Sequence, residues 1–588
     1  MRNIRSKRAL GLLPILVLLL AAAGWAREGD RQQDLLKVSV PAGHPGGALV
    51  VSQSSEPKTL NPIIAVDQPS RDVIRRTMAD LVHINRATQR TEPALAKSWK
   101  ANRDGSEFTV QLRRGLRFSD GAPFDADDVV FSFQVYLDER VHSPQRDLLI
   151  AGGKPMKVEK LGSYTVRFSF AAPYAPAERV FDSVAILPRH LLEEDYKAGR
   201  INQVWNLTTS PEKIAGLGPF RLKQVVPGEK LVLEKNPYYW KTDSQGQRLP
   251  YLDEMIFLTV PNRDAQVVRF RAGETQVITQ VSAENYSALQ ADQKKENYAL
   301  YDAGPGLEYN FLVFNLNDDV KGRLPTIEQK QKWFRDRRFR EAISLGIDRA
   351  AIVRLVYQGR AVPLGTPVSP GDKLWFDSQV PVPERSPEKA KKLLQAAGFS
   401  WNSSGSLVDS SGQPVEFSIL VNSGNVQRSQ MATLIQDDLK KIGMNVHVAG
   451  LEFRSATDRV LNSHDYDIAL MGLARGDTDP GPDMGVFAST GETHLWNMGE
   501  KTPATPWEAE IDRLMRKQLV TPNYAQRKKL YDRVQAILAE QQPMIFLASP
   551  HILAAARDGL ENVRPAIMEN YILWNADELF WHTPAGKH

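Results

Sequence analysis

The chain has 588 residues, of which 42% are hydrophobic and 24% are charged. One hydrophobic core seldom serves a chain of this length, so we expect at least two domains, and the composition excludes both a disordered chain and a membrane channel. The formal net charge is +5, but four basic residues stand within the first eight positions. The remainder is nearly neutral, which offers no general attraction for nucleic acid.

Residues 1–26 predict a cleaved export signal. A basic start is followed by an apolar run over residues 9–23 that Pro14 interrupts, and this run is short for a bilayer core, which needs about 20 residues. Gly24 and Ala26 supply the small side chains of a signal peptidase site. We expect cleavage after Ala26. An uncleaved anchor helix is the alternative.

The absence of cysteine narrows both chemistry and location. With no cysteine in the chain, disulfides, thiol nucleophiles, cysteine zinc sites and iron–sulfur clusters are excluded. Lipid attachment through a cysteine after the signal is excluded as well. An exported protein without such an anchor needs an outer barrier to retain it, so we expect a periplasmic location.

The first half of the mature chain is rich in predicted strands. Residues 27–44 are expected to form a polar leader, with order beginning at Gly47. Beyond it, short strands wetted on one face are predicted where apolar and polar residues alternate. These strands cover residues 47–52, 108–113 and 165–170, and Asp127 and Asp128 open a helix between the last two.

The second half alternates strands with helices. Strands are predicted at residues 415–421, 445–448 and 466–472, and an apolar stripe marks a helix over residues 425–442. Strand, helix and strand in this order form the parallel crossover unit of α/β folds. An apolar strand over residues 309–316 is the predicted boundary between this α/β half and the first.

Short motifs in a fixed order carry a family resemblance. Each alone is weak, but together they span residues 45 to about 580, and the chain closely resembles the extracellular solute-binding proteins, family 5. Members of that family bind dipeptides, oligopeptides, nickel chelates and some other solutes. The motifs are residues 92–99 (EPALAKSW), 118–124 (FSDGAPF), 126–129 (ADDV), 216–220 (GLGPF), 236–241 (NPYYWK), 250–254 (PYLDE), 334–336 (FRD), 338–343 (RFREAI) and 347–349 (IDR).

The resemblance implies an α/β fold of the type II periplasmic-binding-protein class, in its large form with an extra subdomain. Two lobes would be joined by two crossing strands and would close on a ligand. Lobe I would comprise residues 45–66, 200–305 and 543–588, with an extra subdomain at residues 67–199. Lobe II would comprise residues 306–542.

The loop after the predicted strand at residues 466–472 is the best candidate ligand site. Ligands of open α/β sheets bind beyond the carboxyl ends of strands, and Arg475, Asp477 and Asp479 stand in this loop. In peptide-binding members a carboxylate of the matching loop holds the ligand's α-ammonium group, and Asp477 aligns with it. A buried ammonium group requires such a partner. The alternative for both acids is turn capping. Trp496 offers a ring that could stack on a ligand, with core packing as its alternative.

Neither a metal nor a cofactor is expected. The acids of this loop resemble the start of a calcium loop, but Pro482 and Ala488 replace the required glycine and glutamate. The ten histidines show no zinc-motif spacing. A nucleophile elbow, a phosphate loop and a dinucleotide fingerprint are all missing, so no enzyme is expected.

The sequence therefore predicts the substrate-binding protein of an ATP-driven importer. It would capture a peptide or a similar amine-bearing solute and deliver it to a membrane permease, and we expect it to be a monomer. Two other functions stay open. One is an exported chaperone or sensor-type interaction protein of the same fold, and the other is an unrecognised periplasmic hydrolase.

Overall fold

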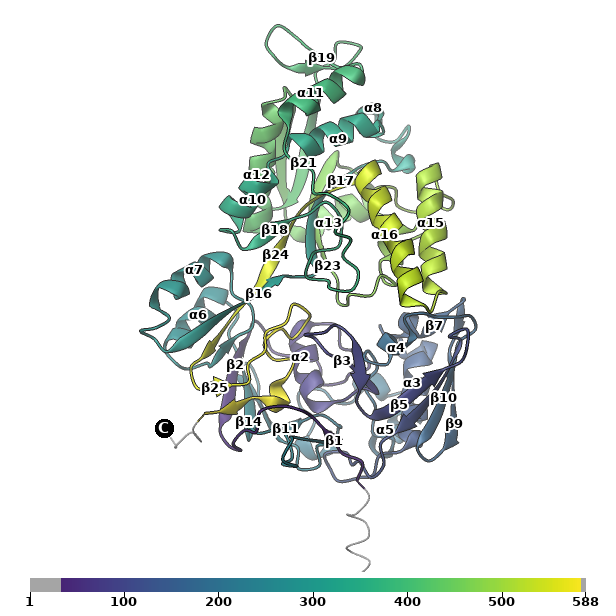
Figure 1. Ribbon diagram of the computed structural model, residues 1–588, viewed down its shortest axis with the longest axis vertical. Coiled ribbons are helices and arrows are strands. Elements are labelled where there is room, and N and C mark those ends of the chain that lie inside the picture. The colour runs from purple at the N-terminus through teal and green to yellow at the C-terminus, as the bar shows by residue number, and fades with distance from the viewer. Residues whose placement is uncertain (1–32, 583–588) are drawn as a thin grey trace, which may run out of the picture.

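A computed structural model describes residues 33–582. The predicted export signal lies outside the described residues. Within them, every helix is too short or too polar to cross a membrane. Two bodies with separate hydrophobic cores form the lower and upper halves of Figure 1. We call them the lower body (residues 33–305 and 551–582) and the upper body (residues 308–548).

One twelve-stranded sheet runs through both bodies, and two strands cross between them. The first crossing is β16 (Tyr298–Pro305), which continues into β17 (Glu308–Phe314). The second is β24 (Met544–Arg557), which pairs antiparallel with β17 at its start and with β16 at its end. The predicted hinge of two crossing strands is confirmed. Within the lower body, the remaining strands of this twelve-stranded sheet are β11 (Phe220–Val226), β12 (Lys230–Lys235), β14 (Glu254–Thr259), β2 (Ala48–Gln53) and β15 (Val277–Ile278).

The upper body contains the predicted crossover unit. Strand β21 (Glu416–Asn422) pairs in parallel with β22 (Asn445–Leu451) on one side and with β23 (Ile468–Ala474) on the other. Between β21 and β22 lies α12 (Val426–Lys440), and the side chain of Asn425, just before it, caps the first turn. The predicted strands and helix are thus confirmed. The other main helices of this body are α8 (Pro325–Phe334), α9 (Arg337–Gly346), α10 (Arg349–Val356), α11 (Pro387–Ala396), α15 (Pro506–Leu519) and α16 (Tyr524–Gln541).

The lower body carries a second, antiparallel sheet. The predicted strands at residues 108–113 and 165–170 form β6 (Glu107–Leu112) and β10 (Thr165–Ser169), which pair with Phe108 opposite Phe168. Helix α3 (Ala126–Leu137) starts with a capping box between Asp125 and Asp128, which explains the acids at its start. The sheet contains β5 (Ala96–Ala101), β6 (Glu107–Leu112), β10 (Thr165–Ser169) and β9 (Lys157–Gly162), and the adjoining helices are α2 (Gln68–Thr77), α4 (Ala177–Val180) and α5 (Arg189–Lys197).

The motif GLGPF has a structural reason. A Cβ atom added at Gly216 would lie 2.0 Å from the backbone oxygen of Thr77, and one at Gly218 would lie 2.5 Å from that of Arg76. Only glycine permits this approach, because real Cβ contacts never come so close. The motif therefore fixes the last turn of α2, which carries Arg75 and Arg76.

The prediction that residues 27–44 form a polar leader without ordered structure is wrong in part. Residues 36–37 form β1 (Leu36–Lys37), which pairs in parallel with β13 (Lys241–Thr242), and Val40 is buried. Order therefore begins before Gly47. The sequence does not reveal strand β1, because its partner strand lies far away in the chain and the segment is too short to show periodicity. Residues 27–32 of the predicted leader lie outside the described part of the chain.

Candidate functional site

A cavity of about 430 Å³ lies between the two bodies. Its upper wall is the loop that follows β23, and its lower wall is built around α4. Tyr309 of the crossing strand β17 and Glu569 of the C-terminal segment complete the lining. The predicted Arg475, Asp477 and Asp479 all line this cavity. Chain segments that are far apart in the sequence therefore meet at one cavity.

Another cavity, of about 610 Å³, lies on the opposite face of β17. Successive side chains of a strand point to opposite faces, and Tyr309 lines the first cavity whereas Asn310 lines this one. Of these two cavities, only the first is lined by residues that follow Ala474 in the loop. Because ligands of α/β sheets bind beyond the carboxyl ends of strands, we take the first cavity as the candidate site.

Asp477 forms an ion pair across the cavity with Arg179 of α4. Nε of Arg179 lies 2.6 Å from Oδ2 of Asp477, and Nη2 contacts Oδ1. Nη2 also donates to Oγ1 of Thr478 at 3.0 Å, and Nη1 donates to the backbone oxygen of Gln89 at 2.8 Å. Burial alone would raise the pKa of Asp477, but the Arg179 guanidinium outweighs it, so this pKa lies below its usual value. The carboxylate is therefore charged at neutral pH.

Asp479 pairs with Arg527 of α16 instead. Its two oxygens accept from Nη1 and Nη2 of Arg527 at 2.6 and 2.7 Å, and both side chains are buried. The backbone N–H of Gly481 donates to Oδ1 at 2.7 Å, as the turn-capping alternative expects. Asp479 thus fastens the loop to α16.

Arg475 is also held by protein groups. Its Nη1 lies 2.8 Å from Asp372 and its Nη2 lies 3.3 Å from Asp483, which also accepts from Tyr531 at 2.5 Å. Burial raises the pKa of Asp372 to about 6, although Arg475 opposes the shift. Arg475 therefore lines the cavity as part of a buried network that joins three segments of the upper body.

Trp496 is not part of this cavity. Its side chain is fully buried in the upper-body core, where Nε1 donates to Glu508 at 2.9 Å and the ring lies against Trp507. The expectation that it stacks on a ligand gives way to its alternative, core packing. The residue follows the loop in sequence, but α15 covers its ring.

Several cavity residues come from the lower body and were not predicted. Arg86 donates to Asp182 from Nη1 and Nη2 at 3.3 Å each, and Arg75 reaches Glu569 at 3.4 Å. The only local signal was the arginine pair at the end of α2. Ion pairs from segments far apart in the chain have no sequence spacing that could reveal them.

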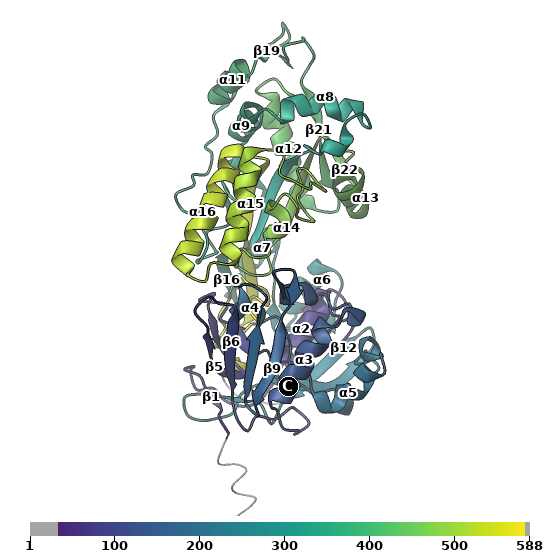
Figure 2. The same ribbon diagram turned by 90° about the vertical axis from the view of Figure 1, so that its right-hand side faces the viewer.

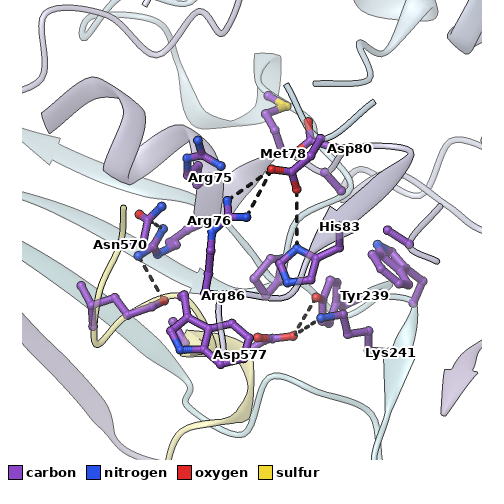
Figure 3. Close-up of a pocket in the computed structure, with 18 of the residues that line it drawn as sticks. Arg75, Arg76, Met78, Asp80, His83, Arg86, Tyr239, Lys241, Asn570 and Asp577 are labelled. Carbon is purple, nitrogen blue, oxygen red and sulfur yellow. Dashed lines mark hydrogen bonds and ion pairs between the residues drawn. The ribbon is translucent and has the colours of Figure 1, made fainter. Parts of the chain in front are cut away.

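A smaller cavity of about 100 Å³ lies behind this wall, and Arg75, Arg86 and Asp182 line both cavities. Arg86 donates to Asp182 in this wall, and Nδ1 of His83 lies 3.8 Å from Oδ1 of the same residue. Figure 3 shows Lys241 turned toward Asp577, with Nζ and Oδ2 separated by 3.0 Å. Burial, with Lys241 and Arg86 nearby, lowers the pKa of His83 well below its usual value. The lower wall is therefore a packed network of charged groups.

Direct contacts join the two bodies beside the cavity. Nε2 of Gln89 donates to the backbone oxygen of Gly371 at 2.7 Å, and its Oε1 accepts from the backbone of Lys373 at 2.8 Å. The backbone N–H of Ala175 donates to Leu519 at 2.7 Å, at the end of α15. In Figure 2 the lower ends of α15 and α16 accordingly lie next to α4. With the Arg179–Asp477 pair, these contacts close one edge of the site.

Comparisons with known proteins agree with this architecture. The chain is 29% identical over 526 residues to a probable ABC transporter-binding protein of Deinococcus radiodurans, covering 86% of this chain and 87% of the relative. It is 27% identical over 575 residues to the oligopeptide-binding protein AppA of Bacillus subtilis, covering 95% and 96%. The solved structure of that protein with a nonapeptide matches with a TM-score of 0.67 at 26% identity, covering 92% of this chain and all of the other.

These likenesses confirm the two-lobed α/β fold, and the relatives are described as an oligopeptide-binding protein and a probable ABC transporter-binding protein. Residues 90–494 match the family model described as bacterial extracellular solute-binding proteins, family 5 Middle, which is more than half of the chain. The chain therefore belongs to the bacterial extracellular solute-binding proteins of family 5.

Proposed function

We propose that the protein captures a peptide or a similar amine-bearing solute in the cavity between its two bodies and delivers it to the permease of an ATP-driven importer. The observation that carries this proposal is the charged Asp477 at the end of β23, inside a cavity lined by both bodies. The peptide ligand of the AppA structure supports the same class of solute. Native mass spectrometry of the purified protein tests it, because a co-purified ligand is identified directly.

Asp477 is the proposed anchor for the ligand's ammonium group, although Arg179 already contacts it. A carboxylate offers about four acceptor positions. Oδ1 of Asp477 accepts from Arg179 and from the backbone of Thr478, whereas Oδ2 accepts from Nε of Arg179. Oδ2 therefore keeps a lone pair for an ammonium group. The ligand would share the carboxylate with Arg179, and Arg475 and Asp479 would support the loop.

The lobe boundaries predicted from the sequence form part of the same proposal. Residues 45–66, 200–305 and 543–588 would act as lobe I with residues 67–199 as its subdomain, and residues 306–542 as lobe II. We further propose that the protein works as a monomer without catalysis. An unchanged peptide after long incubation supports a binding protein, whereas turnover would favour the hydrolase alternative.

Export gives a direct prediction. If residues 1–26 are removed, the mature chain begins at Arg27 and is released when the outer membrane is disrupted. N-terminal sequencing of the protein from the released fraction measures this. An intact residue 1–26 segment on membrane-bound protein would contradict the periplasmic location.

Ligand binding is expected to favour a compact form. A solute that contacts both bodies binds the closed state better than the open one, so it shifts the population toward closure. Small-angle X-ray scattering at saturating peptide should give a smaller radius of gyration than the ligand-free protein gives. If the free protein is more extended than this structure and stays so at saturation, capture between the bodies is wrong.

A further inference from the structure

A buried group of three possible metal ligands lies in the upper body, outside the cavity. His494 belongs to the long connection between α14 (Met484–Phe487) and α15, as does Glu500, and Glu508 stands in the first turn of α15. One donor atom from each residue lies within 4.8 Å of the other two. The side chains are almost inaccessible, with 0% exposure for His494, 6% for Glu500 and 4% for Glu508.

Two of these donor atoms have no partner. Nε2 of His494 and Oε2 of Glu500 are buried without a hydrogen bond, and they face each other at 3.4 Å. Nε2 also lies 3.9 Å from Oε1 of Glu508. Buried polar atoms are rarely left without a partner, because the desolvation penalty is high. Buried polar atoms that lie close together without a hydrogen bond indicate that an ion binds between them.

The hydrogen bonds around the group fix the state of its ligands. Nδ1 of His494 lies 3.2 Å from the backbone oxygen of Val486, and because a carbonyl can only accept, Nδ1 carries a proton. Nε2 is therefore free to bind a metal in the neutral ring. Metal-bound histidines commonly use their other nitrogen in this way. Oε1 of Glu500 accepts from Asn497 and Ala504, which orients Oε2 toward the histidine.

An imidazolium held by two carboxylates is the competing explanation, and the distances argue against it. Charge-assisted N–H···O bonds contract to about 2.7–2.9 Å. Four of the six other histidine–carboxylate pairs among the described residues lie at 2.5–2.9 Å, although all six are more exposed than this group. The pairs at 3.4 and 3.9 Å are thus too long for bonds between opposite charges, but they suit ligands on either side of an ion.

We infer that His494, Glu500 and Glu508 bind a divalent zinc ion. Zinc takes imidazole nitrogen and carboxylate oxygen at about 2.0–2.2 Å, usually with four ligands, so water would supply the fourth. Two carboxylates and a neutral imidazole compensate its charge, whereas the same group with an imidazolium would bury a net negative charge. Calcium and magnesium prefer oxygen ligands alone, which the imidazole does not offer.

Electrostatics of the group favour a cation. The carboxylates of Glu500 and Glu508 lie 3.4 and 3.9 Å from Nε2 of His494. Two negative charges therefore lie beside this nitrogen. Since Val486 lines the ligand cavity and accepts from His494, the ion would fasten the wall of the cavity to α15. Its role would be structural.

Zinc binding is tested on the full mature chain without a histidine tag, after chelation and desalting. Titration calorimetry with zinc chloride at neutral pH should give one tight site per chain. Elemental analysis after gel filtration should find one zinc, and X-ray absorption should show one nitrogen and several oxygen donors. The melting temperature should rise with zinc but not with magnesium or calcium. No retained zinc and an unchanged melting temperature would overturn the inference.

Variants locate the site. Glu500→Gln removes one ligand charge but keeps Oε1 and the volume, and His494→Gln removes the nitrogen ligand. Each should weaken zinc binding by about a hundredfold or more, since even outer partners of such sites contribute about 10–100-fold. His447→Gln, at an exposed pair with Glu416, is the matched control and should retain wild-type affinity. If His494→Gln does not fold, Glu500→Gln decides alone. Zinc binding that survives Glu500→Gln lies elsewhere and refutes this site.

Discussion

Replacing Asp477 with asparagine should weaken the binding of a peptide with a free amino terminus by at least about a hundredfold. The change removes the charge and nearly preserves the volume. The ligand's ammonium group would then be buried beside a neutral amide, and breaking a buried charge pair costs about 3–5 kcal/mol. Each 1.4 kcal/mol corresponds to about a factor of ten in affinity. Calorimetric titration with a small panel of peptides measures the effect.

Arg179 provides the control for this prediction, because Asp477→Asn also breaks its ion pair. Arg179→Gln leaves the carboxylate to the ligand, so the affinity should rise. If the pair only held the two bodies together, both variants would weaken binding alike. An N-acetylated peptide supplies a second control, since it has no ammonium group and should bind wild type and Asp477→Asn equally. A change below about threefold for the free peptide would place the anchor elsewhere.

Replacing Asp479 with asparagine should act on stability rather than on recognition. The variant leaves Arg527 buried without its carboxylate, and an uncompensated buried charge costs about 3–5 kcal/mol. We expect the free energy of unfolding of the upper body to fall by about that amount. Urea denaturation followed by tryptophan fluorescence measures it, since Trp375 lies against Arg527. Peptide affinity should fall less than for Asp477→Asn.

A double variant separates the ion pair from the loss of packing. Asp479→Asn combined with Arg527→Gln removes both charges, so no charge remains buried alone. Residues in contact are not additive, and the double variant should be more stable than the sum of the two single losses predicts. Strict additivity would show that Asp479 and Arg527 do not depend on each other, contrary to their paired oxygens and nitrogens.

Two acids of one loop thus have different partners. Asp477 and Asp479 are two positions apart, and the sequence offers the same alternatives, ligand contact or turn capping, for both. The partners differ in the folded chain: Arg179 comes from the lower body, 298 positions away, and Arg527 from a helix of the upper body, 48 positions away. Only the first pair crosses the cavity. The sequence alone cannot distinguish the roles of Asp477 and Asp479, because neither arginine partner stands at a characteristic distance along the chain.

The sequence by itself determined the elements and their order. Alternation and apolar stripes depend on residues a few positions apart, so the strand, helix, strand unit around α12 and the hinge strand β17 were predictable. The ordered motifs determined the family. Because strand β23 was predictable, the loop at its carboxyl end was too, and with it the position of Arg475, Asp477 and Asp479.

Only the tertiary structure decided how the side chains meet. It buried Trp496 in the core, paired β1 with β13, and brought Arg179 onto Asp477. It also gathered His494, Glu500 and Glu508, whose spacing matches no metal motif. Such contacts depend on how whole segments pack against one another in the folded chain. Packing is set by the sum of many weak contacts over the whole molecule, and no local pattern of residues records it.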